Sequence, residues 1–183
     1  MGDDGWRGRR AARVVLLDRD RRVLLLQAGD PFDPAAPTWW EIPGGGQDPG
    51  ETSDDAAARE LYEETGITDA EMGPCVWVQH AEFDFGGYHF VQRERIHVAW
   101  CGEAPEIRPA HLEALEALSF RGGRWWTLDE LAASAVRTLP AALRTLLPDL
   151  VGGRLPDPPR DITGLTDPRR SGAPPDGPDG VVD

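Results

Sequence analysis

The sequence contains no lysine, and all 19 of its basic residues are arginine in a chain of 183 residues. Arginine can be favoured where a protein binds phosphate, because its guanidinium makes bidentate contacts. Alanine, glycine and proline have GC-rich codons as arginine does, and glycine and proline together supply 38 residues (21 and 17). The base composition of a GC-rich bacterial genome explains this pattern better, so we infer no phosphate site from the absence of lysine.

A positive net charge, metal-binding cysteine spacing and long apolar runs are absent as well. The net charge of −13 disfavours a nucleic-acid partner, because phosphate backbones repel such a surface. Cys75 and Cys101 form no CxxC pair and lie in apolar runs, which predicts buried free thiols. The N-terminus has no apolar h-region and no stretch approaches 18 apolar residues. We therefore expect a cytoplasmic protein that has no membrane partner.

Composition divides the chain into one domain and two tails. Residues 1–11 are polar and predict a flexible N-terminus, whereas residues 12–150 carry the apolar runs of a globular domain. Residues 151–183 are rich in proline and glycine and poor in large apolar side chains, so they cannot bury enough area to offset their ordering entropy. We expect a disordered C-terminal tail, with local order at most near Ile162–Leu165.

Apolar patterning and turn residues predict an α+β domain with a mixed or mostly antiparallel sheet. A helix is expected to begin near Thr52, Ser53 and Asp54 and to end at Gly66. The remaining expected elements are a hairpin of residues 13–17 and 23–27, a strand at 39–42, a second hairpin of 75–85 and 88–101 turning at Gly86-Gly87, a strand at 124–128, a short helix from Asp129 to Ala135 and a helix at 139–150.

Three carboxylates share one face of the expected helix at 52–66. Glu60, Glu63 and Glu64 are related as i, i+3 and i+4, and like charges at this spacing repel each other. A solvated acidic face is the ordinary explanation for such a run. A hard divalent cation explains it better here, because Mg²⁺ takes oxygen ligands and the preceding Gly44-Gly45-Gly46 run lets backbone approach an ion or a phosphate closely.

Arg59 and Glu51 flank the cluster. Their opposite charges favour an ion pair that ties the glycine loop to the helix, which would be a structural brace. Direct contact between Arg59 and a substrate phosphate is the alternative.

These residues resemble the signature of a known family. Residues 45–67 match the Nudix box, Gly-x5-Glu-x7-Arg-Glu-U-x-Glu-Glu-x-Gly-U with U a bulky aliphatic residue. The stretches at 40–45 and 124–131 also look like the strand before the box and the last strand and helix of Nudix (MutT-like) hydrolases. The resemblance covers about residues 12–150, and all nine defined positions of the box are met: Gly45, Glu51, Arg59, Glu60, Leu61, Glu63, Glu64, Gly66 and Ile67.

The resemblance implies a Nudix fold, an α/β/α sandwich with a mixed central sheet, and a Mg²⁺- or Mn²⁺-dependent hydrolase. Its substrate would be a nucleoside diphosphate linked to another group, and Arg59 would belong to the catalytic set together with the carboxylates. The general base stays open between one of the box carboxylates and a glutamate outside the box, for which Glu113 and Glu116 are candidates unless they form an exposed helical face. Many family members are dimers, so a homodimer stays open too. The implied metal ligands are Glu60, Glu63, Glu64 and the carbonyl of Gly44.

The substrate is not marked by the residues downstream of the box. The places that carry family marks for ADP-ribose or dinucleoside polyphosphates hold Glu82, Phe83 and Phe85. Arg93 and Arg95 would meet a phosphate or lie on an exposed strand face. His80, His89 and His97 have no ligand spacing and are expected to be surface or structural residues. Candidate stacking partners for a nucleotide base, if they are not core residues, are Trp39, Trp77, Phe83, Phe85 and Tyr88.

Two other functions stay open. A non-catalytic nucleotide sensor usually has a degraded box or an attached DNA-binding domain, and the sequence has neither. A prenyl diphosphate isomerase of Nudix fold uses a cysteine in a different motif, which Cys75 and Cys101 do not obviously supply.

Overall fold

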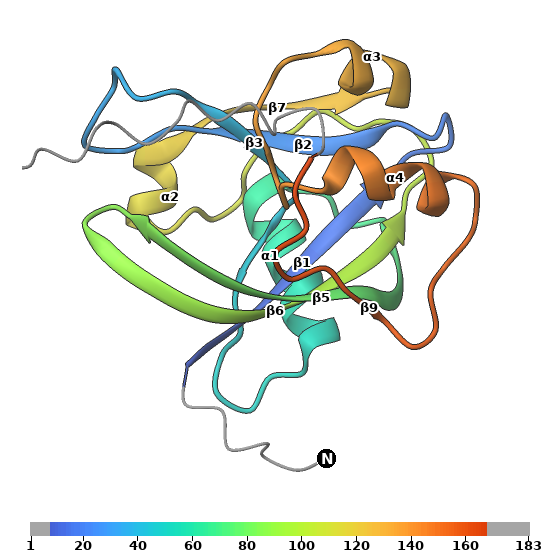
Figure 1. Ribbon diagram of the computed structural model, residues 1–183, viewed down its shortest axis with the longest axis horizontal. Coiled ribbons are helices and arrows are strands. Elements are labelled where there is room, and N and C mark those ends of the chain that lie inside the picture. The colour runs from blue at the N-terminus through green and yellow to red at the C-terminus, as the bar shows by residue number, and fades with distance from the viewer. Residues whose placement is uncertain (1–7, 168–183) are drawn as a thin grey trace, which may run out of the picture.

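The first two strands bury alternate side chains in two separate hydrophobic cores, as the computed structural model of residues 8–167 shows (Figure 1). In β1 (Arg9–Leu17), Val15 and Leu17 belong to one core, and Val14 and Leu16 belong to the other. Alternation of this kind follows from the two-residue period of a strand. A sheet with two apolar faces must be covered on both, and this requirement produces the layers.

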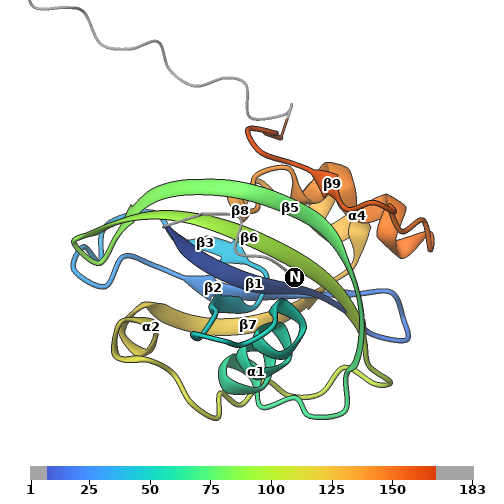
Figure 2. The same ribbon diagram turned by 90° about the horizontal axis from the view of Figure 1, so that it is seen from below.

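Helices cover the two faces. Helix α1 (Ser53–Thr65) packs Ala56, Ala57 and Leu61 against one core, whereas α4 (Leu143–Val151) packs its leucines against the other. Figure 2 shows α1 and α4 on opposite sides of the sheet. The α/β/α arrangement predicted from the sequence is confirmed.

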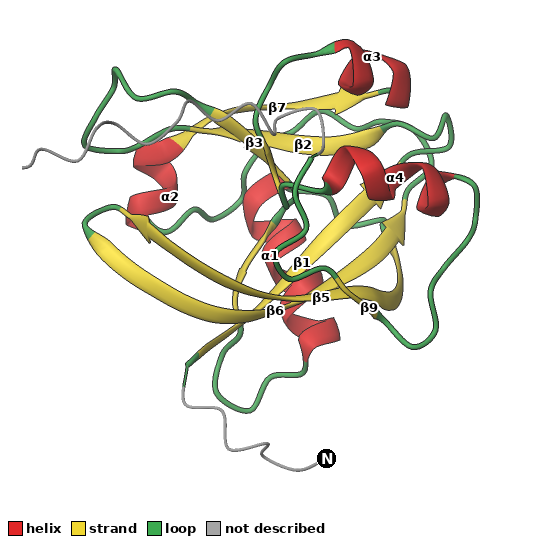
Figure 3. Ribbon diagram, viewed as in Figure 1, coloured by secondary structure: helices red, strands yellow, loops and turns green. Residues whose placement is uncertain are grey.

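The sheet of the described residues has nine strands and mixes parallel and antiparallel pairs (Figure 3). Its main path runs β8-β3-β2-β1-β6-β5-β9, with β4 paired to β1 and β7 paired to β2. Besides β1, the strands are β2 (Val23–Ala28), β3 (Trp39–Glu41), β4 (Gly44–Gly46), β5 (Glu71–Phe85), β6 (Tyr88–Trp100), β7 (Phe120–Trp126), β8 (Thr138–Leu139) and β9 (Arg160–Asp161).

The first expected hairpin forms only at its turn. Within the described residues, the β1–β2 register is the single pair Leu17 and Val23, after which the strands diverge. β1 instead runs parallel to β6, from Arg9 opposite Gln92 to Leu17 opposite Trp100. Residues 9–11 therefore belong to a strand, which corrects the flexible N-terminus expected for 1–11, of which residues 1–7 lie outside the description. A strand with two apolar faces gains more from a central position than from a local hairpin.

The second hairpin is confirmed. β5 and β6 pair along their length, and Gly86 and Gly87 both have positive φ (58° and 79°), as a tight hairpin turn requires. Both ends of α1 are confirmed too. The Thr52 side chain accepts a hydrogen bond from the backbone of Asp55, and Gly66 ends the helix with a φ of 75°.

The later helices depart slightly from expectation. α2 (Ala114–Ser119) precedes β7, and α3 (Leu128–Ala133) is capped by Thr127 rather than by Asp129. α4 starts at Leu143 and not at residue 139, because Thr138 and Leu139 pair with β3 as β8. In the described part of the chain, no helix has the length and apolar character needed to cross a membrane. Cys75 and Cys101 are free and buried, as expected.

The segment after α4 is folded through residue 167, where a disordered tail was expected. β9 pairs in parallel with Trp77 and Val78 of β5, and Ile162 is buried in the core on the α4 face. The carboxylate of Asp167 pairs with Arg144 of α4 at 3.0 Å, with both side chains buried. Strand pairing, a buried apolar residue and an ion pair therefore anchor a segment whose composition predicts disorder. Residues 168–183 of that tail lie outside the description.

Replacing Gly66 by alanine is expected to destabilise the protein more than the same change at Gly87. Both glycines have positive φ, which costs a residue with a Cβ about 1–2 kcal/mol. A Cβ at Gly66 would also lie 2.3 Å from the carbonyl oxygen of Arg108, whereas nothing lies within 4 Å at Gly87. Urea unfolding of the two variants measures the difference, and equal losses would contradict the packing of the 101–113 loop against α1.

Candidate active site

Helix α1 carries the three predicted carboxylates at different depths. Glu60 is buried at 6% exposure, and burial raises its pKa to about 7 despite the neighbouring Arg59. Glu64 is partly buried, and its Oε2 accepts a hydrogen bond of 2.7 Å from the backbone nitrogen of Gly44. Burial, with a further contribution from Glu41, raises the pKa of Glu64 well above its usual value. Glu63 is more exposed. The cluster therefore combines two carboxylates in a poorly hydrated environment with one nearer to solvent.

Arg59 connects the glycine loop to the helix. Its Nε and Nη2 each lie 3.0 Å from an oxygen of Glu51, and Nη2 also donates to the carbonyl of Gly46 at 2.7 Å. Its Nη1 lies 2.9 Å from both Glu60 and Glu63. The expected pair with Glu51 is thus present, and the same guanidinium also contacts two of the carboxylates.

The glycine loop leaves no room for side chains. A Cβ at Gly45 would lie 2.7 Å from Oε2 of Glu60, and a Cβ at Gly44, whose φ is +139°, would lie 2.4 Å from the carbonyl oxygen of Ala12. Glycine is required at both positions because β4 passes between β1 and the carboxylates of α1.

A partly buried arginine that sequence analysis missed holds the loop from the other side. Arg13 of β1 donates through Nη1 to the carbonyl of Gly44 at 3.0 Å and through Nε to Glu94 of β6 at 2.8 Å. Burial would raise the pKa of Glu94, but Arg13 and hydrogen bonds from Gln79 and Gln92 outweigh it and lower that pKa. The sequence signal that could have identified this pair is a charged residue within each of two mostly apolar strands, Arg13 in β1 and Glu94 in β6. Glu41, the last residue of β3, was missed in the same way.

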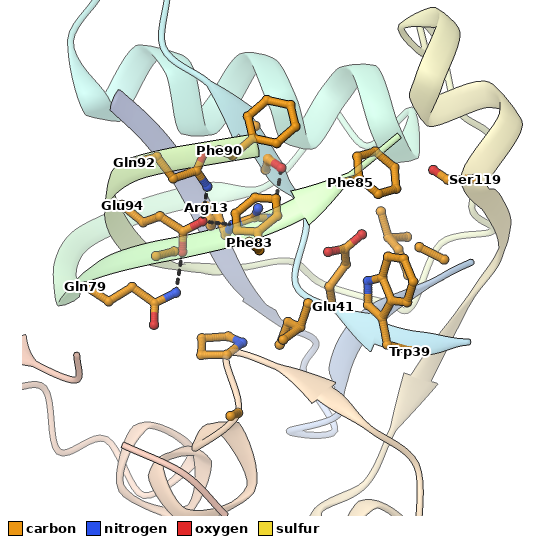
Figure 4. A pocket seen from close by; sticks show the side chains of 18 of the residues that line it. Arg13, Trp39, Glu41, Gln79, Phe83, Phe85, Phe90, Gln92, Glu94 and Ser119 are labelled. Atoms are coloured by element: carbon orange, nitrogen blue, oxygen red, sulfur yellow. Dashed lines mark hydrogen bonds and ion pairs between the residues drawn. The ribbon is translucent and has the colours of Figure 1, made fainter. Parts of the chain in front are cut away.

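A cavity of about 440 Å³ opens beside these groups (Figure 4). Gly44, Gly45 and Glu64 line it, so two of the four predicted metal ligands face this space, whereas Glu60 and Glu63 are not among its lining residues. Figure 4 shows Glu41 between the Trp39–Phe85 pair and the group formed by Arg13 and Glu94. Further lining residues are Arg9, Gln79, Phe83, Phe90, Gln92, Glu116, Arg137, Ile162, Gly164 and Leu165. The cavity is thus bounded by carboxylates, amides and aromatic rings.

The predicted pocket residues divide into three groups. Trp39, Phe83 and Phe85 line the cavity, Trp77 is buried in the core, and Tyr88 is exposed outside it. Glu116 of α2 lines the cavity, where burial raises its pKa, whereas Glu113 lies at the start of α2 and outside the cavity lining.

The predicted arginines and histidines mostly lie elsewhere. Arg93 and Arg95 do not line the cavity and contact His80 and Ser53, respectively. His89 is exposed beside Asp84, and His97 is buried beside Ser53, which leaves His80 as the histidine of the cavity wall.

The donor set suits a hard divalent cation. All predicted ligands are carboxylate or carbonyl oxygens, which Mg²⁺ and Mn²⁺ prefer. The raised pKa values of Glu60 and Glu64 show that burial disfavours their charged forms, and a bound cation would offset this cost. Among residues 8–167, no three acidic, histidine or cysteine side chains are already gathered into a metal-binding group. Arg59 contacts Oε1 of Glu60 and Oε2 of Glu63, and its hydrogen bonds leave the second oxygen of each carboxylate to another ligand.

Comparison with known proteins agrees with this geometry. The model of the NUDIX domain family matches residues 7–150. An RNA pyrophosphohydrolase of Caulobacter vibrioides is 35% identical over 130 residues, which cover 64% of this chain and 70% of that protein. A putative 8-oxo-dGTP diphosphatase of Bacillus subtilis is 41% identical over 59 residues, which cover 32% of this chain and 36% of the relative.

Solved structures show the same fold at low identity. The dihydroneopterin triphosphate pyrophosphohydrolase of E. coli superimposes with a TM-score of 0.57 at 21% identity and covers 79% of this chain and 95% of that one. An Ap4A hydrolase of C. elegans, in a binary complex, gives a TM-score of 0.54 at 22% identity, with 79% and 96% covered. With its box on α1, its sandwich fold and a family match over residues 7–150, the chain belongs to the Nudix family of hydrolases, which act on pyrophosphate bonds.

Proposed function

We propose that the protein hydrolyses a diphosphate bond in a nucleotide-type small molecule, with Mg²⁺ or Mn²⁺ bound by Glu60, Glu63, Glu64 and the carbonyl of Gly44. One observation carries this proposal. Glu64 and the glycine loop face a cavity whose other walls include aromatic rings and amides. A single ligand would therefore place its phosphates at Glu64 and the glycine loop, and its base against the aromatic rings and amides.

The protein's own groups prepare this site. Arg59 holds Glu51 and the carbonyl of Gly46, which fixes the loop relative to the helix, and Arg13 holds the carbonyl of Gly44 from the other side. We assign Arg59 to bracing rather than to phosphate contact because all of its nitrogens have partners inside the box. A bound divalent cation polarises phosphate oxygens and lowers the pKa of an attacking water.

Two residues are candidates for the general base. Glu41 and Glu116 line the cavity, and burial raises the pKa of both, which makes each carboxylate a stronger proton acceptor. Glu113 is set aside because it does not line the cavity.

The isomerase alternative loses support. Cys75 and Cys101 are buried, do not line the cavity, and have thiol pKa values that burial raises, so neither is a reactive thiolate.

A hydrolysis screen tests the proposal. The purified protein is incubated with nucleoside triphosphates, nucleotide sugars, dinucleoside polyphosphates and 5′-triphosphorylated RNA, in Mg²⁺, Mn²⁺ or EDTA, and released phosphate and diphosphate are measured. The RNA is included because of the name of the Caulobacter relative. We expect metal-dependent cleavage of at least one small nucleotide. Cleavage in EDTA would contradict the metal role, and binding without cleavage of any substrate would favour a nucleotide sensor.

A further inference from the structure

We propose that Arg9, the first residue of β1, binds a phosphate group of the substrate and so extends the active site beyond the Nudix box. This inference rests on the proposed function, because it assigns a phosphate contact within that same site. The composition of residues 1–11 predicts a flexible N-terminus and gives no sign of such a role. The position of the guanidinium in the folded chain is what points to a phosphate.

Arg9 lies directly against the glycine loop. β4 pairs with β1, and a Cβ at Gly46 would lie 2.5 Å from Nη2 of Arg9 and 2.9 Å from its Nε. The guanidinium therefore occupies the space over Gly46 where any other residue would have its side chain. Gly46 is two residues from Gly44, whose carbonyl is a proposed metal ligand, and both belong to β4. Arg9 and that metal ligand thus lie along one short strand.

The guanidinium also faces the cavity. Arg9 is one of the lining residues, and it is exposed, so a ligand can reach it. Its Cζ lies 5.3 Å from the ring centroid of Phe90, and a cation is favoured over an aromatic face. Burial raises the pKa of Glu116, and the charge of Arg9 counteracts part of that rise. The guanidinium is therefore close to Gly46, Phe90 and Glu116, in the space that Glu64 also faces.

The charge of the cavity wall explains the use of an arginine at this point. Acidic side chains outnumber arginines among the lining residues, so the wall repels a phosphate chain unless cations offset it. Three arginines line the cavity. Arg13 donates to Glu94, and Arg137 stands over the ring of Trp39. Arg9 is therefore the lining arginine best placed to meet a phosphate at the glycine loop, where a guanidinium makes charge-assisted hydrogen bonds to phosphate oxygens.

The Arg9→Met variant is expected to raise the KM for the best substrate of the screen at least about tenfold. Its kcat should stay near the wild-type value, because a contact made equally in the ground and transition states acts on KM alone. Arg9→Lys keeps the charge without the planar fork and should give an intermediate KM. Arg10→Met is the matched control, because Arg10 is exposed, points to the opposite face of β1 and does not line the cavity. Its KM and kcat should match the wild type.

The Gly46→Ala variant tests the position of the guanidinium independently. Gly46 does not have a positive φ, and the new Cβ would meet the end of the Arg9 side chain and not the backbone. The fold is therefore expected to tolerate the change, which the urea midpoint checks, while the displaced guanidinium raises KM. In the Arg9→Met background the same change should raise KM no further, because residues in contact do not act additively.

Three results would overturn the inference. These are an unchanged KM in Arg9→Met, a fall in kcat at unchanged KM, and additive effects of Arg9→Met and Gly46→Ala. If no substrate is cleaved, the proposed function fails by itself. Calorimetric binding of inorganic diphosphate in the presence of Mg²⁺ then decides the inference. Arg9→Met is expected to bind diphosphate at least about tenfold more weakly than the wild type, and equal affinity would contradict the phosphate contact.

Discussion

The Glu64→Gln variant is expected to lose at least about a hundredfold in turnover and to keep its full stability. The glutamine can still accept the hydrogen bond that Gly44 donates, so the loop stays attached to α1. The negative charge needed to bind a cation is lost. Burial and Glu41 already disfavour that charge in the folded protein, so its removal costs the fold nothing.

Turnover on the best substrate of the screen and the urea midpoint are measured for the same preparation. Glu103→Gln is the control, because it removes one negative charge from an exposed side chain outside the cavity lining. It should change neither quantity. Normal turnover by Glu64→Gln would remove Glu64 from the proposed metal ligands, and a lower midpoint would show that its charge has a structural role.

The Arg144→Met variant is expected to destabilise the protein by about 3–5 kcal/mol, because it leaves a buried carboxylate without its ion-pair partner. Arg144 pairs with Asp167 at 3.0 Å, and the two side chains are 7% and 5% exposed. It also donates to the carbonyl oxygens of Leu131, at 2.9 Å, and Val136. One side chain thus holds α3, the following loop and the C-terminal segment to α4.

Arg154→Met is the matched control for this loss. Arg154 follows α4 and pairs with Asp149 of that helix, but the two side chains are 68% and 55% exposed. An exposed pair contributes at most about 1 kcal/mol. Urea unfolding of both variants should therefore separate them clearly. Similar midpoints would mean that the segment up to residue 167 contributes little to the folded state.

Elements with a strong local signal were predicted from the sequence. The ends of α1 follow from Thr52 and Gly66, whose roles depend on neighbours four residues away or fewer. The β5–β6 hairpin follows from Gly86 and Gly87. The carboxylates of α1 were recognised for the same reason, since their positions on one helix depend only on spacing, while their role in binding a metal is still a proposal.

Contacts between distant residues could not be predicted. Arg13 and Glu94 are 81 residues apart in sequence, and nothing local shows that β1 runs beside β6. The C-terminal segment is a similar case. Its composition predicts disorder, but pairing of β9 with β5 and burial of Ile162 supply the stabilisation that composition cannot show.

The folded C-terminal segment also explains why the Nudix box identifies the reaction and leaves the substrate open. The family match ends at residue 150, yet Ile162, Gly164 and Leu165 line the same cavity as Glu64. The surface that a substrate meets is therefore shared between the domain that defines the family and a stretch beyond it. Two proteins can have identical boxes and still enclose their ligands with different walls.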